Sequence, residues 1–137
     1  MTDADQRSVH VAIGDESDVT IARIRAHRLA IDDGFTEVGA GAVATAVSEL
    51  ARNVLVHARS GELLLSIAER GSRRGIVAVV RDDGPGMIEP ERVMEDGYST
   101  AGSLGLGLPS ARRLVDELHI VTVPGVGTTI TATKWRS

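Results

Sequence analysis

The sequence contains no cysteine. Disulfide bonds, metal sites built from thiolates and cysteine nucleophiles are therefore all excluded. A chain that does without disulfides suits a reducing compartment, and we expect a cytoplasmic protein.

Aromatic residues are scarce as well, since Phe35, Tyr98 and Trp135 are the only three. The core must therefore be built from Val, Ile, Leu and Ala, which suits helices packed on a sheet. A chain of 137 residues can bury roughly 68% of the surface that its unfolded form exposes. We predict a single domain over residues 1–137.

Lysine is almost absent, since Lys134 is the only lysine and the other fourteen of the Lys and Arg residues are arginines. The sequence has no GxxxxGK[ST] phosphate-binding loop, and Lys134 is too close to the end of the sequence to pair with phosphates as in an ordinary protein kinase fold. Any phosphate site must therefore use other groups.

Long apolar runs and basic patches are missing too. The polar, acidic start MTDADQRS is followed by neither a signal peptide nor a membrane span. A net charge of −4, without aromatic residues beside clustered arginines, argues against nucleic acid as the main partner. We expect a soluble protein that binds neither membrane nor nucleic acid.

The hydrophobic patterns that are present predict eight elements in the order strand, helix, helix, strand, strand, helix, strand, strand. Because strands and helices do not strictly alternate, we predict an α+β two-layer sandwich, with helices on one face of a mixed or antiparallel sheet. The expected strands cover 8–13, 62–69, 75–81, 119–123 and 128–135, and the expected helices run from Ser17 or Asp18 to 33, from Thr36 to 59 and from 108 to 118.

Residues 82–108 hold six of the fifteen glycines. Each glycine costs about 1 kcal/mol relative to alanine in regular structure, so a purely structural segment would rarely gather so many. A glycine-rich loop that leads into a helix exposes several N–H groups, with the positive end of the helix dipole behind them. We expect LGLGL, residues 104–108, to bind an anion.

Three other places offer polar groups. Glu49 and Asn53 lie four residues apart on one helix face, where a carboxylate could accept a proton and a carboxamide could bind Mg²⁺. Asp82 follows a strand and could accept a hydrogen bond from the amino group of adenine. Each has a plain alternative: a solvated helix face for the pair, and ordinary turns for DDGPG at 82–86 and GVGTT at 125–129.

Together, ExxxN, DxGPG, GxxGxGL and GTT occur in an order that resembles the four boxes of the GHKL superfamily, the Bergerat-fold ATP-binding domains. The resemblance spans nearly the whole chain. SELARN at 48–53, DDGPGM at 82–87, the segment 95–117 and GTTITATKW at 127–135 are most similar to the RsbT-like stressosome switch kinases within that superfamily.

The resemblance implies a serine/threonine protein kinase that uses ATP and Mg²⁺. Such kinases phosphorylate STAS-domain proteins in partner-switching stress signalling and, once released, activate a PP2C-type phosphatase. Two alternatives stay open: an anti-sigma factor that binds a sigma factor, and a nucleotide-gated binding module with little kinase activity. The catalytic half of a histidine kinase is a third, and a homodimer is a further possibility.

The resemblance also assigns roles to residues. Glu49 would be the general base, and Asn53 would be the Mg²⁺ ligand. Asp82 would bind the adenine amino group, and Thr128 would contact the base through water. The remaining nucleotide-binding residues would be Gly84 and Gly86 beside the base, and Thr100, Leu104, Gly105, Leu106, Gly107 and Leu108 around the phosphates.

Overall fold

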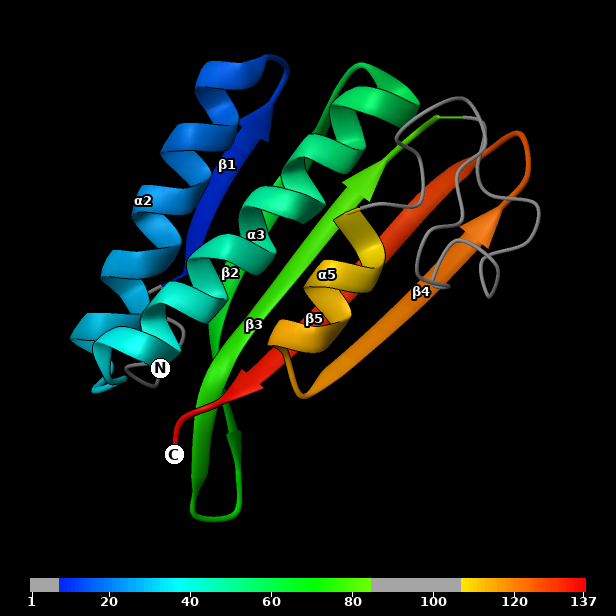
Figure 1. Ribbon diagram of the computed structural model, residues 1–137. Coiled ribbons are helices and arrows are strands. Elements are labelled where there is room, and N and C mark those ends of the chain that lie inside the picture. The colour runs from blue at the N-terminus through cyan, green and yellow to red at the C-terminus, as the bar shows by residue number, and fades with distance from the viewer. Residues whose placement is uncertain (1–7, 85–106) are drawn as a thin grey trace.

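The structure, a computed structural model, describes residues 8–84 and 107–137. Figure 1 shows the elements of these residues in chain order, from blue to red. The predicted order of helices and strands is confirmed. The elements are β1 (Val9–Ile13), α2 (Glu16–Asp32), α3 (Glu37–Ala58), β2 (Gly61–Arg70), β3 (Arg73–Asp82), α5 (Gly107–Leu114), β4 (Glu117–Val123) and β5 (Gly127–Trp135).

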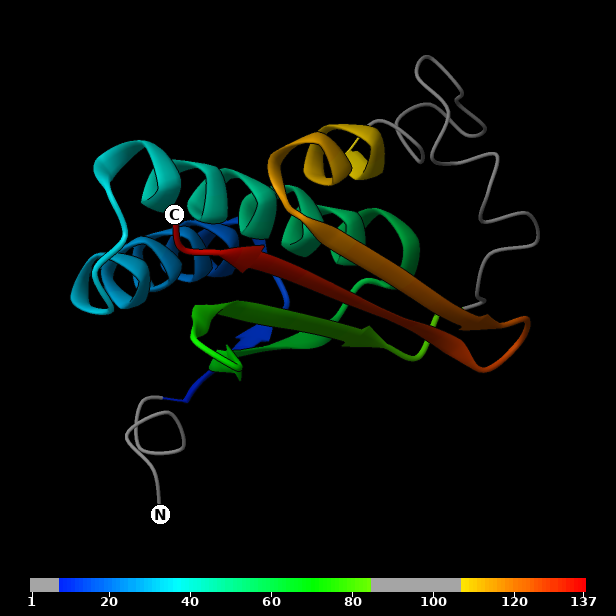
Figure 2. The same cartoon turned by 90° about the horizontal axis from the view of Figure 1, so that it is seen from below.

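The five strands form one sheet in the order β1-β2-β3-β5-β4. Each pairing is antiparallel. Of the two predicted possibilities, a mixed or an antiparallel sheet, the structure therefore has the antiparallel one. The described helices all lie on one face of the sheet, which Figure 2 shows from below. The prediction of an α+β two-layer sandwich is confirmed.

Aliphatic side chains fill the layer between sheet and helices. Every second residue of β2 is buried there, as the pleat of a strand requires: Leu63, Leu65 and Ile67. From α3, Val47 and Leu50 are at most 1% exposed. Full burial of each such side chain stabilises the fold by about 1.5 to 3 kcal/mol. Since α3 lies between α2 and α5 (Figure 1), this packing fixes the polar side chains that α3 carries.

The start of α2 differs from the prediction. Asp15, rather than Ser17 or Asp18, is the N-cap, and its Oδ1 accepts a hydrogen bond from the Asp18 N–H at 3.1 Å. The Asp18 carboxylate accepts in return from the Asp15 N–H at 3.1 Å, which completes a capping box. The Ser17 hydroxyl donates to Asp15 and, together with the Asp18 N–H, lowers the pKa of the Asp15 carboxyl.

The start of α3 agrees with the prediction. Thr36 is its N-cap, and the Thr36 hydroxyl oxygen accepts from the Gly39 N–H at 3.1 Å. The helix then continues for 22 residues. Within the described ranges, no helix is both long and apolar enough to cross a membrane.

The third helix is shorter than predicted. It ends at Leu114 rather than at Leu118, and β4 begins at Glu117. The reason is pairing with β5: the Asp116 N–H donates to the Thr133 carbonyl at 2.9 Å, and the Asp116 carboxylate accepts from the Trp135 N–H at 2.7 Å. These cross-strand bonds override the helical spacing of Val115 and Leu118.

Trp135 covers one end of the sheet on the face away from the helices. Two guanidinium groups lie over its ring, with Arg70 at 5.0 Å and Arg73 at 4.4 Å from the ring centroid. Its indole N–H donates to Glu117 at 3.0 Å. That hydrogen bond, assisted by Arg70, lowers the pKa of the Glu117 carboxyl.

Asp33 joins three distant segments at the same end. Its side chain is 3% exposed and accepts from Arg74 of β3 at 2.6 Å, while its carbonyl accepts from Arg136 at 2.7 Å. The hydrogen bond to Asp33 raises the pKa of the Arg74 guanidinium. The end of α2, the start of β3 and the end of the chain are therefore held together by one residue.

Candidate nucleotide-binding site

The helix-facing side of the sheet changes from apolar to polar at one end. Across β3, β5 and β4 the side-by-side residues Val80, Ile130 and Ile120 are aliphatic. Two positions further along the same strands, the side-by-side residues are Asp82, Thr128 and Thr122. We call these three residues the polar row. Because strand side chains alternate between faces, the polar row extends the aliphatic row on the same face.

Hydrogen bonds orient the polar row. The hydroxyl oxygens of Thr122 and Thr128 lie 3.0 Å apart. The Gly84 N–H donates to Asp82 Oδ1 at 2.9 Å. Thr128 is only 5% exposed, so its hydroxyl has few orientations available.

Two glycines allow the backbone to close around Asp82. A Cβ on Gly84 would lie 2.7 Å from the Ala58 Cβ and 3.1 Å from the His57 carbonyl oxygen, at the end of α3. A Cβ on Gly127 would overlap the Asp82 carbonyl oxygen and lie 2.9 Å from the Asp83 Cα. Both contacts are too short for any larger residue, so the turn after β3 is pressed against α3 on one side and β5 on the other.

The second half of α3 lies against this end of the sheet. A Cβ on Gly61, the β2 partner of Asp82, would be 2.9 Å from the Val54 side chain. The adjacent residue, Asn53, is buried at 6% exposure. Glu49, one turn earlier, keeps 28% of its side chain exposed. The structure therefore packs the second half of α3, with a buried Asn53 and an accessible Glu49, against this end of the sheet.

Arg52 is charged and lies next to the carboxylate of Glu49. Arg52 Nη1 is 3.6 Å from Glu49, and Arg52 Nε is 3.5 Å from Glu16 in the first turn of α2. The three side chains form a chain of opposite charges from α2 to α3, and half-exposed pairs of this kind add little stability. Their effect is on the position of the Glu49 carboxylate.

The start of α5 faces the same end of the molecule (Figure 1). Gly107 is its first residue, and N–H groups of a first helical turn have no partner within the helix. Leu108 is fully buried and anchors this turn of the helix in the core. Pro109 has no N–H to leave unsatisfied there.

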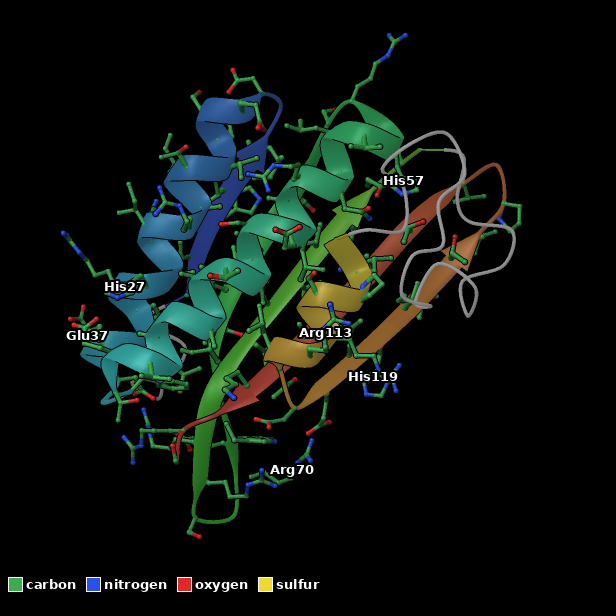
Figure 3. All side chains as sticks on the ribbon, in the orientation of Figure 1. His27, Glu37, His57, Arg70, Arg113 and His119 are labelled. Carbon is green, nitrogen blue, oxygen red and sulfur yellow. The ribbon has the colours of Figure 1, made fainter. Side chains whose placement is uncertain are left out.

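The structure locates some predicted site residues and does not reach others. The predicted residues that lie on the elements just described are Glu49, Asn53, Asp82, Gly107, Leu108 and Thr128, and Gly84 lies in the turn after β3. His57 continues the row of Glu49 and Asn53 and lies in the last turn of α3, where Gly84 meets the helix (Figure 3). The predictions for Gly86, Thr100, Leu104, Gly105 and Leu106 fall outside the described residues.

A hollow of about 550 Å³ lies at this end of the sheet. Arg81, Thr129 and Val121 line it, and their side chains alternate with those of the polar row. They therefore belong to the face away from the helices, so most of this hollow opens on the side of the sheet opposite to α3 and α5, while Asp82 and Thr128 of the polar row also contribute to its lining. The remaining lining residues are Ser60, Gly61, Glu62, Asp82, Asp83, Val123, Val126, Gly127 and Thr128.

Thr122 was not among the residues predicted from sequence. A signal did exist, because Thr122 and Thr128 are equally far from the middle of the turn that joins β4 to β5. Pairing the two strands about that turn places the hydroxyls side by side. Arg52 was also missed, although its spacing of three from Glu49 on a helix predicts contact.

The sequence matches the family described as histidine kinase-like ATPase domain over residues 14–134. The serine/threonine-protein kinase RsbT of Bacillus subtilis is 42% identical over 126 residues, 91% of this chain and 94% of its own. An anti-sigma F factor of a Thermoanaerobacter species is 29% identical over 97 residues, 68% of each chain.

A solved structure is similar as well. The RsbU and RsbW domains of a Mycobacterium tuberculosis protein match with a TM-score of 0.65 at 20% identity. The match covers 95% of this chain and 33% of that one. At this level of identity the likeness concerns the fold alone.

Proposed function

Because the chain belongs to the histidine kinase-like ATPase domain family and is an RsbT-like serine/threonine protein kinase within it, we propose that it phosphorylates a STAS-domain protein. Membership of this family implies ATP as the phosphate donor. The observation that carries the assignment of the site is the polar row, which ends an otherwise aliphatic sheet face where the second half of α3 packs and which the start of α5 faces.

The polar row suits the edge of a purine. The Asp82 carboxylate can accept from an exocyclic amino group, and the Gly84 N–H holds it in place for that role. Ile120 of the neighbouring row is only partly buried and offers an aliphatic surface for the flat base. The backbone N–H groups at the start of α5 would then receive phosphate oxygens.

Asn53 fits a magnesium site in this arrangement. A neutral side-chain oxygen suits a cation that keeps several waters and shares phosphate oxygens, and a buried carboxamide has few conformations to lose. When bound, the ion would neutralise charge on the transferred phosphoryl group.

Glu49 would accept the proton of the attacking serine or threonine hydroxyl. Its carboxylate is accessible from outside, as a protein substrate requires, and Arg52 restrains it on the side of α2. The oxygen of the hydroxyl then forms the new bond to the γ-phosphorus as the bond to the β-phosphate oxygen breaks, which releases ADP.

The partners we propose follow the RsbT-like type. The substrate would be a STAS-domain protein of a partner-switching pathway, and the kinase released from it would activate a PP2C-type phosphatase. The similarity to a kinase named RsbT supports this choice, since that relative matches over almost its whole length.

Phosphotransfer from labelled ATP to a purified STAS-domain protein, in the presence of Mg²⁺, tests the proposal. We expect acid-stable label on serine or threonine with the wild type and with Glu37→Gln, a control on the exposed first turn of the same helix. Glu49→Gln should still bind ATP but lose transfer, and Asp82→Asn should lose ATP binding. Transfer by Glu49→Gln at the wild-type rate would contradict the assignment of the base.

A second candidate is a nucleotide-gated binding protein of the anti-sigma type. It is favoured by the relatives named anti-sigma F factor, whose identity of 29% covers 68% of this chain. Such a protein would bind a sigma factor in a nucleotide-dependent way. Nucleotide-dependent binding to a sigma factor that survives Glu49→Gln, without transfer to any STAS-domain protein, would favour this candidate.

A further inference from the structure

We propose that Thr122 is a positioning residue that donates a hydrogen bond to the Thr128 hydroxyl, leaves the Thr128 hydrogen for the base and thereby makes the site prefer adenine to guanine. The inference rests on the proposed nucleotide site and adds a determinant of its specificity. Its basis is the pair of hydroxyl oxygens 3.0 Å apart between two neighbouring strands.

The pairing of β4 with β5 places the two hydroxyls next to each other. Thr122 and Thr128 are direct partners in the β4–β5 ladder, and Thr128 is in turn the direct partner of Asp82. Thr128 is 5% exposed, so water competes poorly for its hydroxyl. The order Asp82, Thr128, Thr122 thus places Thr122 behind Thr128 as seen from the carboxylate.

A threonine hydroxyl has one hydrogen and two acceptor lone pairs. If Thr122 donates to Thr128, the Thr128 hydrogen is left for the base. If Thr122 accepts from Thr128, that hydrogen is used and only lone pairs remain. The direction of the bond between the two threonines therefore decides whether Thr128 presents a donor or an acceptor.

Adenine requires the first direction. Asp82 accepts from the adenine amino group, and the ring nitrogen next to that amino group is an acceptor that needs a donor. Thr128 can supply it, directly or through a water, only when Thr122 donates to Thr128. Guanine has an acceptor where adenine has its amino donor, and a donor where adenine has its ring-nitrogen acceptor. The guanine oxygen would therefore face the Asp82 carboxylate, and the guanine ring N–H would face the Thr128 hydrogen.

Thr122→Val removes the hydroxyl while keeping the shape and the preference for a strand. The Thr128 hydroxyl can then rotate and serve as an acceptor too. One neutral hydrogen bond changes an equilibrium about threefold to tenfold. We expect Thr122→Val to weaken Mg·ATP binding by that factor, to leave Mg·GTP binding unchanged or stronger, and so to lower the ATP-to-GTP preference by up to about tenfold.

Isothermal titration calorimetry with ATP and with GTP, both with Mg²⁺, measures this ratio. Thr122→Ser keeps the hydroxyl and should restore the wild-type ratio. Thr131→Val is the matched control, because Thr131 is on β5 but alternates to the opposite face from Thr128 and Ile130. In phosphotransfer, Thr122→Val should raise KM for ATP and leave kcat within twofold of the wild type.

The outcomes separate this inference from the proposed function. Equal weakening of ATP and GTP by Thr122→Val, or no change in either, would overturn the role of Thr122 while leaving the nucleotide site intact. If the wild type bound neither nucleotide, the site itself would be wrong and this inference with it. A wild-type ratio in Thr131→Val and Thr122→Ser together with a reduced ratio in Thr122→Val supports the inference.

Discussion

At the scale of single residues, Asp33 is a carboxylate in the core whose partners come from distant segments. Asp33→Ala would remove the acceptor of the 2.6 Å bond from Arg74. A hydrogen bond to a charged group contributes about 1.5 to 3 kcal/mol, so we expect the free energy of unfolding to fall by about 2 kcal/mol. Urea denaturation measures it, and Asp32→Ala is the control because Asp32 is an exposed neighbour. Equal effects of the two substitutions would mean that the Asp33 contact adds nothing.

Glu117 makes the free energy of unfolding depend on pH. Its folded-state pKa is held below the ordinary value of 4.5, chiefly by the hydrogen bond from Trp135. Its contribution to stability is therefore complete above about pH 4.5 and is lost as the pH falls through the lowered pKa. We expect wild type to be more stable than Glu117→Gln at pH 7, and the difference to shrink below pH 4. Urea unfolding followed by circular dichroism at several pH values checks this, and a difference that stays constant with pH would contradict it.

At the scale of elements, the turn after β3 depends on its contact with α3. A side chain on Gly84 would lie 2.7 Å from Ala58, so Gly84→Ala must move the turn and with it the bond to Asp82. We expect Mg·ATP affinity to fall at least tenfold, with a loss of stability of about 1 to 3 kcal/mol from overpacking. Calorimetric titration and urea unfolding measure the two effects.

Gly41 provides the contrasting substitution within α3. Among the described residues, no atom beyond the adjoining residues and the local helix backbone would lie within 4 Å of a Cβ at this position. Gly41→Ala should therefore stabilise the helix by about 0.5 to 1 kcal/mol and leave ATP affinity unchanged. Weaker ATP binding by Gly41→Ala would mean that any change in α3, rather than the contact at Gly84, disturbs the site.

The helix boundaries also show how much of the fold could be predicted from the sequence. Periodicity predicts α3 and its Thr36 cap because both depend on neighbours a few residues away. It fails at the end of α5, since the bonds from Asp116 to β5 join residues far apart in the sequence. It fails at the start of α2 because Asp15 is the N-cap and Asp18 completes the capping box, whereas Ser17 between them caps nothing.

The residues of the candidate site likewise fall into those that local sequence predicts and those that only strand pairing brings together. Glu49, Asn53 and Asp82 stand out in the sequence because each belongs to a short motif. Thr122 does not, since its part in the polar row exists only once β4 is paired with β5. The aliphatic row beside it is likewise a property of three strands.

At the scale of the whole molecule, the proposed nucleotide would bridge parts that the sheet alone does not join. Asp82, Asn53 and the start of α5 come from three elements around one end of the sandwich. A ligand that binds only the folded state at 100 times its Kd stabilises that state by about 2.7 kcal/mol, or roughly 10 °C for a domain of this size. We expect Mg·ATP to raise the Tm by this amount in scanning calorimetry. Asp82→Asn should melt at the same temperature with and without nucleotide, whereas an equal rise in both proteins would place ATP elsewhere.

In the part of the chain that the structure describes, the helices lie on one face of the sheet, and Trp135 with its two arginines covers one end of the other face. Thr128 and Trp135 stand at opposite ends of β5, seven residues or roughly 23 Å apart. The sequence has one tryptophan, so its intrinsic fluorescence is a single signal from a known place. Emission should shift to longer wavelength when the buried indole becomes exposed to water on unfolding, and should change little when nucleotide is added. The protein therefore contains its own optical reporter of folding, far enough from the proposed catalytic end that ligand titrations need not disturb it.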